Sequence, residues 1–307
     1  MSNRKKILVL VMSCNKEHFI AQEKVCRETW AKGIFDGNFP DVEYYSYTGG
    51  NNKGYVDKKK HHIYCTYDDG IYKTFQKTCE CLDLLSKYGV KYDYIFRTNT
   101  STVINVGLLK AYINRGLDDN VVYCGELYSI GIPCPGPQFI YARGNSIILS
   151  RKLISIILDW SKYVKIPDLL FADDNIIGNI LNTYHVLRFE PHREYLKSYG
   201  FAWHKSLPKE SDIVLDNGCS SWTDDDDSYE HLKNFISIQI KSYNDRTEEF
   251  DRMRYISSIV NIPKTDYSDE FEFIDKYSAN AKYFLNDRKK NISTYLDFND
   301  KKRAQKV

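Results

Sequence analysis

Polar side chains follow apolar segments at three points where a ligand site would form. They are Ser13 and Asn15 after the apolar run 7–12, residues 97–101, and the adjacent carboxylates Asp173 and Asp174. In an open α/β sheet, ligands bind beyond the carboxyl ends of the strands, so these stretches are the candidates for chemistry. The carboxylate pair stands where a loop gives way to a predicted helix. It suits proton transfer and equally suits capping of that helix, and the residues alone leave both interpretations open.

Three familiar active-site motifs are missing from the sequence. It has no G-x-G-x-x-G after a predicted strand, no G-x-x-x-x-G-K-[ST] and no G-x-S-x-G. The first two bind phosphates at helix N-termini, and the third presents a nucleophilic serine. Their absence argues against dinucleotide oxidoreductases, P-loop NTPases and α/β-hydrolases.

Strands and helices alternate up to about residue 190, and they must position the candidate residues. The apolar run at 6–13 predicts a buried strand, and residues 70–88 repeat apolar side chains at helical spacing. Further strands are expected at 42–47, 92–97, 120–124, 138–149 and 184–190, with helices at 17–31, 105–114, 151–161 and 173–182. This alternation predicts an α/β fold with a mainly parallel sheet flanked by helices.

The pattern changes after about residue 228. Residues 229–260 contain no glycine or proline and predict a long helix, and the tail after 280 is polar and basic. We therefore expect an α/β domain over 1–215, followed by a helical C-terminal extension with a basic tail over 216–307.

The net charge and the hydropathy of the chain limit the kinds of partner that we expect. Lysine and arginine number 43 against 41 aspartates and glutamates, giving a formal net charge of +2 and no strong overall field for nucleic acid or anionic lipid. The apolar run at 7–12 is too short to span a bilayer, and no signal-peptide cleavage site follows it. We therefore expect a cytoplasmic protein with no membrane partner, whose eight cysteines are reduced.

Five short blocks lie in order over about two-thirds of the chain. They are residues 27–30 (RETW), 69–78 (DGIYKTFQKT), 94–105 (YIFRTNTSTVIN), 141–151 (YARGNSIILSR) and 173–178 (DDNIIG). In this order they resemble the R-x-T-W, D-x-Y-x-N-L-T-x-K-T, K-T-D-D-D, G-G-A-G and [ED]-D-v-x-x-G motifs of the fringe and β-1,3-galactosyltransferase families. The resemblance implies a Rossmann-like GT-A fold and a nucleotide-diphosphate sugar donor, with a UDP-sugar expected first.

The resemblance also implies roles for single residues. It makes Asp174, beside Asp173, the general base that deprotonates an acceptor hydroxyl as this attacks the anomeric carbon, with inversion. The donor-binding positions fall on Ser13, Asn15, Gly144 and His204. The histidine would lie near the diphosphate, and Ser13 and Asn15 near the nucleotide base and ribose. A packed histidine and ordinary strand-end polarity are the alternatives.

The family's acidic triplet, which holds a divalent cation against the diphosphate, is not present. Its positions are Asn99, Thr100 and Ser101, all neutral, and a hard cation prefers carboxylate oxygens. The residues therefore predict no metal site, or Mn²⁺ or Mg²⁺ bound only weakly, with Asn99 and Ser101 left as donor contacts. Cationic side chains are then expected to neutralise the diphosphate, and the candidates are Arg27, Lys77 and Arg97.

These observations predict a glycosyltransferase acting on a hydroxyl acceptor, either a microbial or viral glycan or hydroxymethylated bases of phage DNA. A DNA acceptor would need its base presented outside the stack, with phosphates bound at the basic stretches 58–62 and 288–306. The alternative is a non-catalytic nucleotide-sugar- or glycan-binding protein that kept the fold and lost the metal site. A nucleic-acid-binding protein without chemistry is disfavoured by the small net charge.

Overall fold

The computed structural model describes most of the chain up to residue 276. The described residues are 4–116, 121–130, 139–162, 172–186, 213–216, 220–223, 229–240 and 248–276. Their α-helices are α1 (Glu17–Glu28), α2 (Lys32–Phe35), α3 (Thr74–Lys87), α4 (Val106–Gly116), α5 (Arg151–Ser161), α6 (Asp173–Val186) and α8 (Glu248–Val260). There are also two short 3₁₀ helices, η1 (Ile71–Lys73) and η4 (Tyr229–Asn234).

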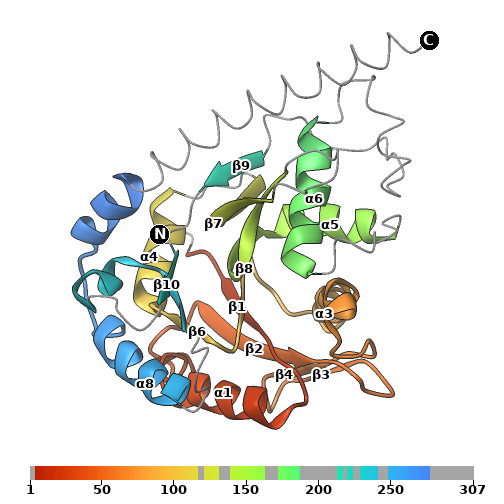
Figure 1. Ribbon diagram of the computed structural model, residues 1–307, viewed down its shortest axis with the longest axis horizontal. Coiled ribbons are helices and arrows are strands. Elements are labelled where there is room, and N and C mark those ends of the chain that lie inside the picture. The colour runs from red at the N-terminus through yellow and green to blue at the C-terminus, as the bar shows by residue number, and fades with distance from the viewer. Residues whose placement is uncertain are drawn as a thin grey trace.

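An eight-stranded mixed sheet forms the centre of the molecule (Figure 1). Its strands are β1 (Ile7–Met12), β2 (Val42–Thr48), β3 (Tyr55–Asp57), β4 (His62–Tyr64), β5 (Tyr94–Asn99), β7 (Val121–Ile130), β8 (Phe139–Ser150) and β9 (Ile213–Asp216). They lie in the order β3-β4-β2-β1-β5-β8-β7-β9. Among these strands, β3 and β8 run opposite to the rest, so the predicted α/β fold with a mainly parallel mixed sheet is confirmed.

Helices cover both faces of this sheet, which is why its central strands are apolar throughout. Leu8 and Leu10 of β1 belong to a core shared with α3, α5 and α6. Val9 and Val11 belong to a second core, on the opposite face, shared with α1, α4 and α8. Residues two apart along a strand share a face, so these two cores mark the two faces of the sheet. The position of a side chain that could do chemistry is described below by the face on which it lies.

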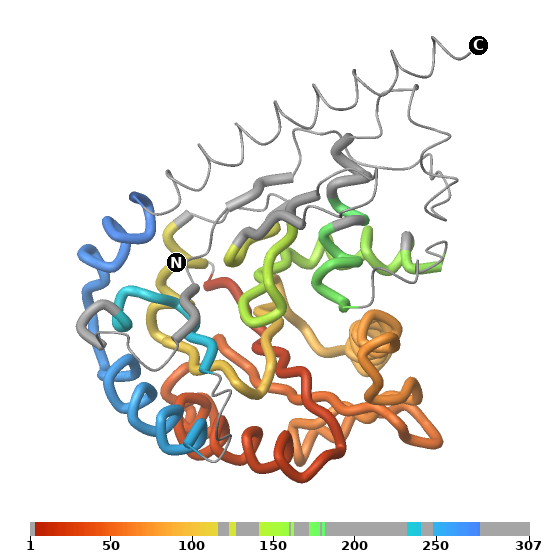
Figure 2. Tube along the Cα trace, viewed as in Figure 1, coloured from red at the N-terminus to blue at the C-terminus, as the bar shows by residue number. Residues whose placement is uncertain are grey.

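The described part of the C-terminal segment packs into the same fold. A second sheet of three strands is formed by β6 (Thr102–Ile104), β10 (Ser220–Thr223) and β11 (Ser237–Ile240), in the order β10-β11-β6. Figures 1 and 2 show α8, in blue, alongside the red α1, and Met253 of α8 shares a core with Val9 of β1. Described residues on either side of 216 thus share one core, while the division of the chain at 216 stays a prediction.

Most predicted elements occur within a few residues of their expected bounds, with two exceptions. The single helix predicted over 229–260 is correct only in its last part, where α8 spans Glu248–Val260, because residues 237–240 form strand β11. Absence of glycine and proline permitted a helix, but alternating Ile238 and Ile240 are buried where β11 pairs with β6. The strand predicted at 184–190 is also wrong at its start, because α6 continues to Val186; its remaining residues lie outside the described ones.

Six of the eight cysteines lie in the described residues and all six are free thiols. No helix within the described part of the chain is long and apolar enough to cross a membrane.

Candidate functional site

The strand order reverses next to β1, and this reversal marks where a ligand site would form. After β1 the chain builds β2 and β4 on one side, then crosses to place β5 on the other. Met12 pairs with Asn99, so the residues that follow β1 and β5 leave the sheet side by side. Crevices at such a switch point, beyond the carboxyl ends of parallel strands, are the usual binding sites of α/β folds.

A buried ion pair joins β5 to the start of α6. The Nη2 atom of Arg97 lies 2.7 Å from both carboxylate oxygens of Asp173, and each residue is only 2% exposed. Thr78 of α3 donates a further hydrogen bond to Asp173, at 3.0 Å. Burial is the largest single effect and would lower the pKa of Arg97, but Asp173, Tyr47 and Asp174 together outweigh it and hold that pKa above its ordinary value. The arginine is therefore charged, and its charge is neutralised inside the protein.

Gly144 of β8 connects this pair to the second carboxylate. Its carbonyl oxygen accepts a hydrogen bond from Nη1 of Arg97, and its N–H donates to Oδ2 of Asp174 at 2.8 Å. A Cβ atom at this position would overlap Arg97 and lie 3.3 Å from Oδ2 of Asp174. Glycine fits here because any larger residue would have to displace the buried Arg97 side chain.

Asp174 has the features of a group poised to exchange a proton. Its Oδ1 accepts hydrogen bonds from the backbone and side-chain nitrogens of Asn175, each at 2.8 Å. Burial, and then the charge of Asp173, raise its pKa above the usual 3.8, and the Arg97 guanidinium only partly opposes this. The capping interpretation also has some support, because Asn175 lies in the first turn of α6. Asp173, in contrast, faces Arg97 and Thr78.

A second buried ion pair ties together the ends of β1 and β2. Lys77 of α3, 1% exposed, donates to Oδ1 of Asp69 at 2.6 Å and to the carbonyl of Ser13 at 2.9 Å. Asp69 also accepts the backbone N–H groups of Asn15 and Gly49, each at 2.8 Å. The Asn15 side chain closes the ring by donating to the Gly49 carbonyl at 2.7 Å. Sequence reasoning missed Asp69 as a site residue, although it opens the block that contains Lys77.

The neutral residues at the former metal positions are bonded to one another and to α1. Oδ1 of Asn99 accepts hydrogen bonds from the hydroxyls of Ser101 and Thr102, each at 2.9 Å. The Thr100 hydroxyl donates to Gln22 at 2.8 Å. These donors and acceptors include no carboxylate, so they do not fit a hard divalent cation. Within the described ranges, no three His, Cys, Asp or Glu side chains lie close enough together to hold a metal ion.

The structure brings some predicted site residues together and separates others. Those that it brings together directly are Arg97, Gly144, Asp173 and Asp174. On the same face of the sheet, the ion pair of Lys77 with Asp69 links the backbone of Ser13 to that of Asn15. Arg27 lies on the opposite face, over the Tyr44 ring at 4.9 Å. His204 lies outside the described residues.

Comparison with known proteins finds matching solved structures, one of which is described below. No protein-family model matches the chain, and no curated protein matches it at a significant level. The solved structure is that of a glycosyltransferase involved in the glycosylation of the major capsid of PBCV-1. The two sequences are 11% identical, the match covers 81% of this chain and 99% of the other, and the TM-score is 0.45.

Proposed function

We propose that this protein is a GT-A glycosyltransferase that moves a sugar from a nucleotide diphosphate, with UDP the expected nucleotide, to an acceptor hydroxyl. The proposal rests on one observation: four of the five sequence blocks that resemble this enzyme class meet in one hydrogen-bonded cluster. Thr78, Arg97, Gly144 and the carboxylate pair come from four separate elements of the chain. Residues so far apart in sequence converge around Asp174, at the carboxyl-end side of the sheet where α/β ligand sites form.

In the proposed reaction Asp174 accepts the proton of the acceptor hydroxyl. The hydroxyl oxygen forms the new bond to the anomeric carbon while the bond to the diphosphate oxygen breaks, so the sugar is transferred with inversion and UDP leaves. A raised carboxyl pKa suits this role, because a base works best when its pKa is near the working pH. The Gly144 N–H holds one carboxylate oxygen in place during the transfer.

Arg97 and Lys77 are proposed to act by positioning, not by neutralising the diphosphate. Each is at most 2% exposed and paired with an internal carboxylate, Asp173 or Asp69. Through these pairs, Arg97 fixes the backbone at Gly144 and Lys77 fixes the ends of β1 and β2. The expectation that these cations face the diphosphate therefore fits the geometry poorly.

The decisive variant is Asp174→Asn, assayed for UDP release and sugar transfer and for UDP binding. General bases contribute about 10²–10⁴-fold, so turnover should fall by that factor while UDP affinity changes little. Asp159→Asn on α5, whose carboxylate is 59% exposed and pairs with Lys162, is the matched control and should behave as wild type. Equal turnover in the two variants would reject Asp174 as the base. UDP binding with no turnover in the wild type would favour the non-catalytic binding protein.

Two acceptor classes, a glycan and hydroxymethylated DNA, are distinguished by salt. Transfer to DNA depends on phosphate contacts, so its rate at low substrate should fall steeply between 50 and 200 mM salt, by orders of magnitude if about six or more phosphates are bound. Transfer to a neutral oligosaccharide should be nearly constant over that range. The same titration with each acceptor decides between them.

A further inference from the structure

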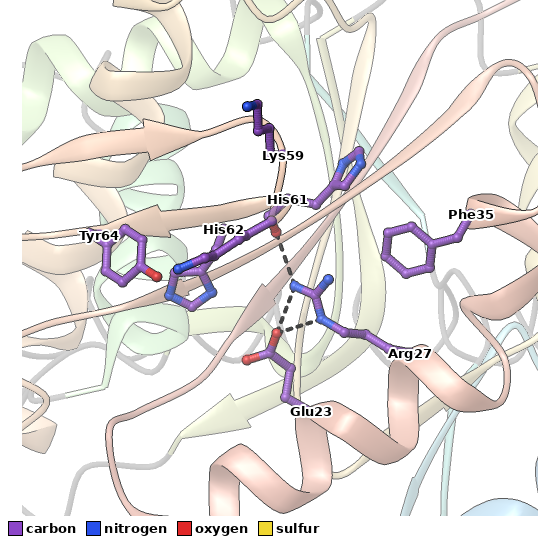
Figure 3. A pocket seen from close by; sticks show the side chains of 8 residues that line it. Glu23, Arg27, Phe35, Lys59, His61, His62 and Tyr64 are labelled. Carbon is purple, nitrogen blue, oxygen red and sulfur yellow. Dashed lines mark hydrogen bonds and ion pairs between the residues drawn. The ribbon is translucent and has the colours of Figure 1, made fainter.

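A cavity of about 600 Å³ lies between α1, α2 and the β3–β4 hairpin. Glu23 and Arg27 of α1 form one wall, Phe35 of α2 another, and Lys59, Lys60 and His62 the hairpin side (Figure 3). It lies on the face of the sheet covered by α1, whereas Asp174, Arg97 and Lys77 lie on the face covered by α3 and α6. The cavity is therefore separate from the site to which we assign glycosyl transfer.

Arg27 is held rigidly but keeps one nitrogen available. Its Nε donates to Glu23 at 2.9 Å, and its Nη2 donates to the Ser46 hydroxyl and the His61 carbonyl at 3.0 and 3.2 Å. The other terminal nitrogen, Nη1, points away from Glu23 in Figure 3. A guanidinium fixed in this way presents a donor to a ligand at little further entropic cost.

A hydrogen-bonded network behind Glu23 and Arg27 favours the His62 tautomer with a proton on Nδ1. The Ser46 hydroxyl donates to Glu23 at 2.6 Å, so its oxygen must accept the hydrogen bond from Nδ1 of His62, at 2.7 Å. Nε2 of His62 lies 2.9 Å from the Thr48 hydroxyl, which completes its partners. Both ring nitrogens are thus occupied, and Glu23 is satisfied from two sides. The network supports Arg27 and leaves the lysines to set the charge of the cavity.

The charges and walls of the cavity define what it would bind. Three cationic side chains, Arg27, Lys59 and Lys60, line it against the single carboxylate of Glu23, and Lys60 has only a weak pair, 4.0 Å from Asp57. Phe35 is 38% exposed, with Arg27 over its ring at 5.4 Å. A doubly charged anion balances the excess of cations, and the exposed ring suits an attached flat group.

We propose that this cavity binds a phosphate monoester that carries a flat, apolar or aromatic group. Phosphate monoesters are close to doubly charged at neutral pH, because their second pKa is about 6. Nη1 of Arg27 and the amino groups of Lys59 and Lys60 donate to the phosphate oxygens, and Phe35 contacts the attached group.

The test is calorimetric titration of phenyl phosphate and of inorganic phosphate into the full chain at low salt. Phenyl phosphate should bind more tightly than inorganic phosphate. Replacing both Lys59 and Lys60 by Gln should weaken phenyl phosphate binding roughly tenfold or more, since two charge-assisted donors are lost. Lys58→Gln is the matched control: it comes from the same turn, but its Nζ donates to the Tyr88 carbonyl at 3.2 Å and it does not line the cavity.

Two further measurements, on an Arg27 variant and with an oligonucleotide, separate this proposal from its alternatives. Arg27→Gln should abolish phenyl phosphate binding without changing UDP binding; loss of UDP binding instead would return Arg27 to the donor site and overturn the proposal. A short single-stranded oligonucleotide, a phosphodiester, should bind more weakly than phenyl phosphate. Tighter oligonucleotide binding, or equal losses in Lys58→Gln and in the double variant, would also overturn it. None of these outcomes depends on whether Asp174 is catalytic.

Discussion

Replacing Asp173 by Asn should destabilise the protein strongly while changing almost no volume. The substitution leaves the Arg97 guanidinium charged, 2% exposed and without its carboxylate. Removing one partner of a buried ion pair costs about 3–5 kcal/mol. The Asn side chain keeps an oxygen that can accept from Arg97, so we expect the lower end, about 3 kcal/mol. For a chain of this length that corresponds to a fall of roughly 5 °C in Tm.

The assay is urea unfolding at pH 7, followed by fluorescence and by circular dichroism. Asp174→Asn is the matched control, and it should cost less than Asp173→Asn because the hydrogen bonds of the Asp174 carboxylate come from the neutral donors of Gly144 and Asn175. Its native pKa is raised above the unfolded value, so the stability that Asp174 contributes is complete at low pH and is lost as pH rises through the native pKa. Asn cannot ionise, so it removes this pH dependence along with one acceptor.

A double variant checks the cause. Arg97→Met combined with Asp173→Leu replaces the pair by apolar side chains and should recover most of the loss, because buried pairs often exchange for apolar residues with little net effect. If Asp173→Asn changed the free energy of unfolding by less than about 1 kcal/mol, or matched Asp174→Asn, the claim that Arg97 depends on Asp173 would be refuted.

Two further predictions concern the edge of the sheet. Gly49→Ala should cost more free energy of unfolding than Gly50→Ala. A Cβ at Gly49 overlaps the backbone carbonyl of Tyr67, and such overpacking costs about 1–3 kcal/mol. Gly50, at φ +77°, has open space and only its left-handed backbone to strain. Equal losses in urea unfolding would contradict this. Burial lowers the pKa of His62 below 6.5 despite Glu23, so the stability contributed by neutral His62 is present above about pH 6.5 and is lost as pH falls through the native pKa. Tm measured at pH 7.5 and pH 5 should therefore fall less in His62→Gln than in wild type, and an unchanged fall would contradict the assignment.

The spacing of apolar residues along the sequence was sufficient to predict the strands and helices that position the site. The run Ile7–Met12 is apolar throughout because helices cover both faces of β1, and this made the strand predictable. Phe75, Leu82 and Leu85 recur at helical spacing because α3 buries one face. Strand β11 was not predictable in this way, because its pairing with β6 joins residues more than 130 positions apart.

The contacts within the site could be predicted only in part. The carboxylate pair was found from its place at a helix start, but the pairing of Asp173 with Arg97 depends on how α6 packs against the sheet. Arg27 was predicted as a donor contact on the strength of its block, and α1 packs on the face of the sheet opposite to α3 and α6. Asp69 was missed because its partners, Lys77 and the ends of β1 and β2, meet only in the folded chain.

Calorimetric titration of UDP and UDP-sugars into the wild-type protein, in EDTA and again with Mn²⁺, tests the central claim most directly. The side chains at Asn99, Thr100 and Ser101 do not fit a hard cation, so we predict saturable UDP binding that survives EDTA. Binding that requires Mn²⁺ would contradict the metal-independent donor site. Failure of every nucleotide to bind, with or without metal, would contradict the glycosyltransferase proposal itself.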